Sequence, residues 1–172
     1  MVLIAPEYKR ICGIHMQEQG EIGAVWMAHD KETDRIHLYD ACVFKNEVLA
    51  VIAEGLNARG RWIPIAWTND DKDLADQLLK RGCTTLYEPA QEVTEMTSRD
   101  IDERMRSKRF KVEPRLGEWL EEFKAFYKEG SQVPKGFPLM TATRIAVADL
   151  RKAKRQASKS KSQKNYPQVA MI

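Results

Sequence analysis

The sequence predicts an α/β fold in which helices flank a mixed β-sheet. Three observations indicate this class: three strand-like segments come first, a helix-like segment follows them, and strand-like and helix-like segments then alternate. Antiparallel strands in series, followed by alternating helix and strand, build a mixed sheet with helices on its faces.

The first three strands are expected over residues 9–14, 23–29 and 35–43. The polar segment 30–34 joins the second strand to the third, and two strand-like runs joined by so short a turn form a β-hairpin. Apolar and polar residues alternate along the third run, as in a strand with one face in the core.

A helix is expected next, over residues 47–58. Ile52 and Leu56 recur at helical spacing, Asn46 is a typical N-cap residue, and Gly60 is a typical stop. The sequence therefore predicts that the helix begins directly after Asn46.

The short apolar run over residues 62–67 predicts a fourth strand that is buried on both faces. It is too short for a helix and rich in strand-forming residues. The remaining expected elements are a helix over 73–81 closed by Gly82, a fifth strand over 84–87, a helix over 98–108, an extended piece over 110–112, and helices over 116–127 and 139–154. This order is the layout of the ribonuclease H-like fold.

Length and charge predict one domain and a tail. The 172 residues are enough for a single core, which we expect over residues 1–155, followed by a basic, disordered tail over 156–172. Residues 151–172 hold seven of the 28 basic residues and none of the 25 acidic ones, which leaves residues 1–150 with a net charge of −4. Such a tail attracts polyanions by counterion release, and a solubilising role is the alternative.

Several classes of protein do not fit the sequence. No apolar run approaches the roughly 20 residues needed to span a bilayer. The three cysteines form no CxxC pair, which argues against a structural zinc site and suggests reduced thiols in the cytoplasm. No GxxxxGK[ST] loop is present, so no ATP site is expected in this chain.

Six segments in order carry a family resemblance: residues 13–15, 23–30, 33–40, 60–70, 105–112 and 139–147. The last begins Leu139-Met140-Thr141-Ala142-Thr143-Arg144 and is the most specific. Together they resemble the nuclease domain of phage large terminase subunits, the proteins that package viral DNA, over residues 7–153.

The resemblance implies a metal-dependent nuclease site built from three carboxylates. Two divalent metals about 3.5–4 Å apart clamp the attacking and leaving oxygens of a phosphodiester, and Mg²⁺ prefers hard oxygen ligands. The resemblance places the three positions at His15, at Asp70, and at Phe137 or Pro138. Since only Asp70 is an acid, we expect no metal cofactor unless the site is rearranged.

Asp70 and Asp71 admit two interpretations. Asp71 could replace a lost ligand, which would leave an active endonuclease that uses Mg²⁺ or Mn²⁺. Alternatively the pair marks a helix start, with Asp70 as the cap and Asp71 favouring the helix dipole.

Basic residues in two segments are predicted to contact the DNA backbone. Arg104 and Lys108 share one helix face at i, i+4, for which a solvated surface is the alternative. The full set is Arg104, Lys108, Arg109, Arg151, Lys152, Lys154 and Arg155.

The leading hypothesis is a pseudoenzyme: a large-terminase-type nuclease domain that does not cut and acts by binding double-stranded DNA or phage packaging proteins in the host cytoplasm. One alternative is the rearranged endonuclease on Asp70 and Asp71. The other is a protein-interaction module that mimics the terminase domain without affinity for DNA. None of the three requires a membrane.

Overall fold

The computed structural model describes residues 4–91, 93–128 and 136–157. The disordered tail predicted from the sequence lies outside the described residues from residue 158 onward.

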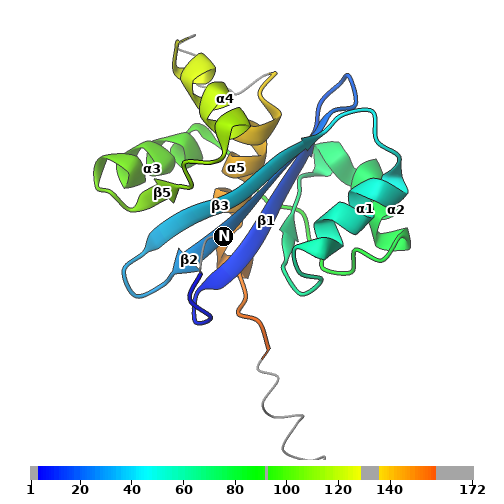
Figure 1. Cartoon of the computed structure of the whole chain (residues 1–172), viewed down its shortest axis with the longest axis horizontal. Helices are drawn as coiled ribbons and strands as arrows, with labels where there is room; N and C mark the ends of the chain where they lie inside the picture. The colour runs from blue at the N-terminus through cyan, green and yellow to red at the C-terminus, as the bar shows by residue number, and fades with distance from the viewer. Residues whose placement is uncertain (1–3, 92, 129–135, 158–172) are drawn as a thin grey trace, which may run out of the picture.

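Within the described residues, a five-stranded mixed sheet forms the centre of the molecule, in the order β4-β1-β2-β3-β5 (Figure 1). Consecutive strands β1 (Lys9–Met16), β2 (Ile22–Asp30) and β3 (Arg35–Phe44) pair antiparallel. The short strands β4 (Ile65–Ala66) and β5 (Phe110–Val112) add parallel to β1 and β3. The predicted fold class is confirmed.

Helices cover both faces of the sheet (Figure 1). One face packs against α1 (Leu49–Ala58) and α2 (Lys72–Lys80), which follows the 3-10 turn η1 (Asn69–Asp71). On the other face, α5 (Pro138–Ala148) crosses β1 and β2, and α3 (Glu95–Arg106) and α4 (Gly117–Lys128) pack against α5. A second 3-10 turn, η2 (Leu150–Lys152), follows α5.

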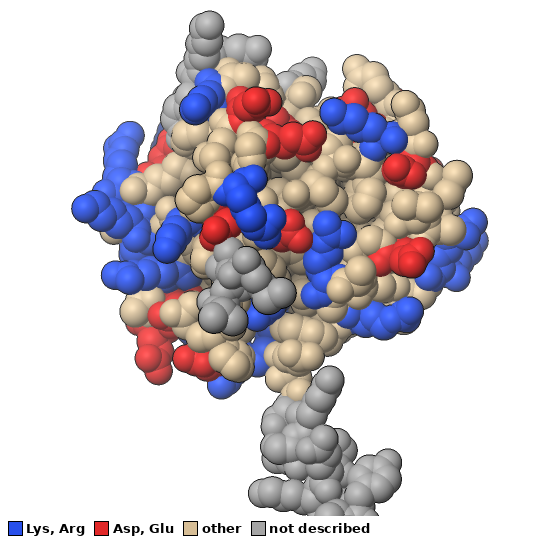
Figure 2. All heavy atoms as spheres, in the orientation of Figure 1, with Lys and Arg blue, Asp and Glu red and all other residues tan. Residues whose placement is uncertain are grey.

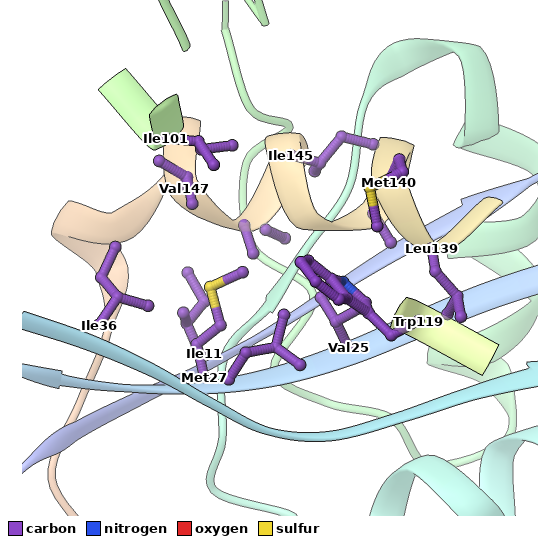
Figure 3. Close-up of a cluster of buried hydrophobic side chains, with 14 of the residues drawn as sticks. Ile11, Val25, Met27, Ile36, Ile101, Trp119, Leu139, Met140, Ile145 and Val147 are labelled. Carbon is purple, nitrogen blue, oxygen red and sulfur yellow. The ribbon is translucent and has the colours of Figure 1, made fainter. Parts of the chain in front are cut away.

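Each face has its own apolar core because successive strand residues point to opposite sides. Ile11 and Val25 face α5 and meet Ile145 and Trp119 there (Figure 3). The cluster on the opposite face includes Trp26 together with residues of α1 and α2.

Two glycines allow α5 to lie directly on the sheet. A Cβ atom at Gly23 would stand 2.6 Å from the carbonyl group of Pro138, and one at Gly13 would overlap the carbonyl oxygen of Ala142. Glycine is needed where backbone approaches backbone this closely. The start of α5 is therefore held against β2.

The fifth strand was predicted in the wrong place. Residues 84–87 form a turn and a loop, which single hydrogen bonds tie to the β4 region: Thr85 Oγ1 donates to the Ile63 oxygen at 2.7 Å, and the Ile65 nitrogen to the Thr85 oxygen at 3.1 Å. The fifth strand is β5, which the sequence indicated only as an extended piece. Without a continuous ladder, an apolar segment beside a sheet stays a loop.

Two helix boundaries also differ from expectation. The first helix begins at Leu49 with Val48 at the N-cap position, and Asn46 instead has φ 54° in the left-handed region, so it is not the cap. The last helix ends at Ala148, and the chain runs through η2 to an antiparallel bridge between Lys154 and Arg10. Finally, none of the helices in the described part of the chain is long and apolar enough to cross a bilayer.

Candidate functional site

Two positions implied by the family resemblance, His15 and Pro138, meet at one end of the sheet, and Asp71, the neighbour of the third position Asp70, lies there too. His15 stands near the end of β1 and pairs with Gly23 of β2, against which Pro138 packs. Asp71 closes η1, directly after β4, which runs parallel to β1. The ends of parallel strands lie at the same edge of a sheet, so β1, β4 and the start of α5 converge here.

His15 and Asp71 form a close pair at this edge. The imidazole Nδ1 of His15 lies 3.0 Å from Oδ2 of Asp71, and the backbone N–H of Met16 donates to the same oxygen at 3.4 Å. The Asp71 side chain is only 3% exposed. A buried carboxylate is costly unless donors compensate it, and both donors here come from the end of β1.

Asp71, rather than Asp70, therefore faces the first strand. Asp70 is exposed, and its side chain makes no hydrogen bond or ion pair with another residue in the described part of the chain. The interpretation of Asp70 as a helix cap is wrong: Asp71 occupies the N-cap position of α2, and its carboxylate makes no capping hydrogen bond.

The third position implied by the family resemblance has no side chain that could bind a metal ion. Phe137 is the N-cap residue of α5, and its ring meets Phe126 edge-on with the centroids 5.9 Å apart. Pro138 is buried at the first turn of α5. Proline suits that place because its missing N–H needs no partner there, but neither side chain can coordinate a metal ion.

Glu122 is a carboxylate at this end of the fold that the sequence reasoning missed. It comes from α4 and accepts hydrogen bonds from the backbone N–H groups of Leu139 at 3.0 Å and Met140 at 3.2 Å, so it caps α5 from outside. One signal was available in the sequence: Glu122 stands three residues after Trp119, on the apolar stripe of its helix.

The position of Glu122 changes its titration. Burial raises the pKa of the Glu122 carboxyl to about 7, against the two N–H bonds, which lower it. The nearby charges of Glu118 and Glu21 raise it further. A carboxyl in this state is bound to the helix terminus and is half protonated near neutral pH.

The carboxylates at this edge are partly committed to hydrogen bonds within the protein. A two-metal centre needs several carboxylates with free oxygens pointing at one space, whereas here both oxygens of Glu122 and the Oδ2 oxygen of Asp71 contact protein groups. Among the described residues, no three His, Cys, Asp or Glu side chains come together closely enough to hold a metal ion.

Two arginines predicted to bind DNA also make contacts within the protein. One nitrogen of Arg104, which is 7% exposed, donates to the backbone oxygen of Asp34 at 2.7 Å and to its carboxylate at 3.1 Å. Arg109 donates to the other carboxylate oxygen at 3.1 Å. Although burial acts against it, hydrogen bonds from His29 and Arg104 lower the pKa of Asp34. These contacts fasten α3 and β5 to the β2–β3 turn, where Asp34 has φ 54°.

All seven residues predicted to contact DNA lie toward the end of the sheet opposite His15. Arg104 and Arg109 gather at the β2–β3 turn, and residues 151–155 lie beside the start of β1, where Lys154 pairs with Arg10. The strand between Lys9 and His15 spans about 20 Å at 3.3 Å per residue. In the view of Figure 2, Lys and Arg side chains gather over α3 and β5, at the left.

The fold defined by this sheet and its helices is the ribonuclease H-like fold of terminase nucleases. The structure is similar to the nuclease domain of the P22 large terminase (TM-score 0.81, 18% identity, 90% of this chain and 87% of that one). It is also similar to the g2p large terminase nuclease domain of bacteriophage SPP1, solved with bound Mn (TM-score 0.66, 21% identity, 83% and 86%). The large terminase of a thermophilic bacteriophage matches at TM-score 0.66 and 12% identity, over 87% of this chain and 42% of that one. No protein-family model and no curated protein matches the sequence.

Proposed function

We propose that this chain is a large-terminase-type nuclease domain that does not cleave DNA and acts by binding double-stranded DNA or a phage packaging protein. The observation that carries the proposal is the pairing of His15 with Asp71 beside Pro138, at the edge where the family resemblance implies a nuclease centre.

The chemistry of that edge supports a role without cleavage. Two-metal hydrolysis depends on carboxylates that coordinate two cations and hold them close together. Here the Oδ2 oxygen of Asp71 is held by His15 and by the Met16 N–H, and Glu122 is held by the first amides of α5. Recruiting Glu122, or the Oδ2 oxygen of Asp71, to a metal would break these hydrogen bonds.

The distribution of basic residues supports DNA binding away from this edge. Residues 151–155 contain four basic side chains, and they lie beside the start of β1. Contacts with phosphate oxygens position a protein on DNA without reading its sequence. A duplex held there would be anchored about 20 Å from His15.

The deciding experiment is plasmid cleavage by the full chain with Mg²⁺ and then Mn²⁺, beside the variants Asp70→Ala and Asp71→Ala. The expected result is intact supercoiled plasmid in every lane, with a shift in mobility where DNA is bound. Cutting by the wild type that Asp71→Ala or Asp70→Ala abolishes would overturn the proposal and establish the rearranged endonuclease.

The binding half of the proposal has its own measurement. Fluorescence anisotropy with a labelled duplex should show binding that weakens steeply with salt, because released counterions drive it. If the folded protein has no affinity for duplex DNA, only the proposed role of binding a packaging protein remains. Capture of packaging proteins on the immobilised chain would then test that role.

A further inference from the structure

A basic hollow lies between residues 87–88 and residues 151–154. It has a volume of about 610 Å³ and is open to solvent. Its lining comes from two segments far apart in the sequence, and it includes three basic side chains and one tyrosine: Tyr87, Glu88, Arg151, Lys152, Ala153 and Lys154.

The backbone on one side of the hollow is anchored to the sheet. The Arg10 nitrogen donates to the Lys154 oxygen at 2.7 Å, and the Lys154 nitrogen donates back to the Arg10 oxygen at 3.1 Å. Ala153, between the basic residues, is 5% exposed and belongs to the apolar core. The basic side chains therefore project from fixed backbone.

Tyr87 and Lys154 form the wall of the hollow. The Lys154 ammonium lies 4.6 Å from the centroid of the Tyr87 ring, and it donates to the Tyr87 hydroxyl at 3.2 Å. Because the hydroxyl oxygen accepts this bond, its own proton is left to donate elsewhere. The Tyr87 residue is 43% exposed, so that proton can reach a ligand in the hollow.

The three basic residues differ in how closely they are paired with acidic side chains. Lys152 is engaged, 2.9 Å from the buried carboxylate of Asp149 and bonded to the backbone oxygen of Glu88. Arg151 is 72% exposed, and its contact with Asp149 is long at 3.9 Å. Lys154 makes no ion pair with an acid among the described residues. Arg151 and Lys154 thus keep donors for an anion.

We infer that this hollow binds a phosphate group of the DNA backbone, with Arg151, Lys154 and the Tyr87 hydroxyl as donors; the inference rests on the proposed function and extends it to one site. Guanidinium, ammonium and phenol groups suit phosphate oxygens, and phosphate contacts position a protein on DNA. In the sequence, three further lysines and no acid follow residue 155, which matches a polyanion that continues past the hollow.

Glu88 provides a control whose expected effect on DNA affinity is opposite to that of the basic residues. Its exposed side chain lies on the lining of the hollow, and a carboxylate repels phosphate. Removing that charge should strengthen DNA binding, whereas removing the charges of Arg151 or Lys154 should weaken it.

The test is fluorescence anisotropy of the full chain with a labelled duplex over a range of KCl concentrations. Arg151→Gln and Lys154→Gln should each flatten the slope of log affinity against log salt, by up to about 0.9 per lost phosphate contact. Tyr87→Phe should weaken binding about two- to tenfold, the loss expected for one hydrogen bond, with the slope unchanged. Glu88→Gln should strengthen binding.

Lys80→Gln is the matched control. Lys80 is exposed at the end of α2, away from the hollow, and this substitution removes the same positive charge as the hollow variants do. An equal loss in this variant would overturn the inference by showing that only net charge matters. So would unchanged binding in Tyr87→Phe and Glu88→Gln, provided circular dichroism shows every variant folded.

The result for the wild type separates the two proposals. Wild-type binding that the hollow variants leave unchanged would overturn the phosphate site alone. A wild-type chain that binds no duplex would overturn this inference together with the DNA-binding half of the proposed function.

Discussion

The imidazole of His15 and the carboxylate of Asp71 lie 3.0 Å apart and join the end of β1 to the start of α2. Fifty-six positions separate them in the sequence. This contact therefore joins two elements that are distant in the sequence at one edge of the sheet.

Replacing Asp71 with alanine should destabilise the protein. The Met16 N–H and the His15 ring would lose their acceptor in a buried place, which costs about 1–3 kcal/mol of unfolding free energy. Urea denaturation followed by circular dichroism measures the loss. Asp70→Ala, at an exposed position, should change stability by no more than about 0.5 kcal/mol. Equal effects of the two substitutions would contradict the assignment of Asp71 as the inward acid.

Gly23→Ala should weaken the packing of α5 on the sheet. The added methyl group would meet the Pro138 carbonyl at 2.6 Å, and backbone on both sides limits relief, so a loss of about 1–3 kcal/mol is expected. Thermal and urea unfolding would both report it. Gly117→Ala is the control, because nothing lies within 4 Å of a Cβ there; a similar loss in that variant would show that the close approach of α5 is not the cause.

The stability of the protein should depend on pH through Glu122. Its carboxyl has a pKa of about 7 in the folded protein, against an ordinary value of 4.5, so folding favours the protonated form. This contribution is present below the ordinary pKa and is lost as pH rises through the folded pKa. Glu122→Gln stays neutral, and its stability relative to the wild type should therefore rise between pH 4.5 and about 7.

Urea titrations at several pH values measure this difference, with the exposed neighbour Glu121→Gln as the control. A constant difference between Glu122→Gln and the wild type across that range would show that the α5 amides hold the carboxylate ionised.

Arg104→Gln should lower stability by about 1–3 kcal/mol, because charged hydrogen bonds to Asp34 and Asp100 are lost. Arg106→Gln removes the same charge from an exposed position on the same helix and should have little effect. Chemical denaturation compares the two. If Arg104→Gln instead kept full stability and weakened DNA binding, the phosphate contact predicted from the sequence would be favoured over the structural role.

Periodicity and turn signals sufficed for the β1–β3 meander and for the existence of most helices, because these features depend on local patterns of apolar residues. They failed at residues 84–87, which were predicted as a strand but form a turn and a loop, and they indicated β5 only as an extended piece, since so short a strand is defined largely by its pairing partner. The prediction of Asn46 as the N-cap of α1 was wrong for a related reason. Asparagine suits both a helix N-cap and a left-handed backbone conformation, and Asn46 adopts the latter.

The sequence by itself determined that the chain forms a mixed α/β sheet flanked by helices, and that the residues at positions 15, 137 and 138 are His15, Phe137 and Pro138, none of them an acid. Only the tertiary structure decided that Asp71 faces His15, that Glu122 caps α5, and that Arg104 is buried against Asp34. The physical reason is that composition and periodicity are properties of neighbours in the chain. The partner of a charged side chain, in contrast, is chosen by how distant segments meet, and burial then makes that choice energetically decisive.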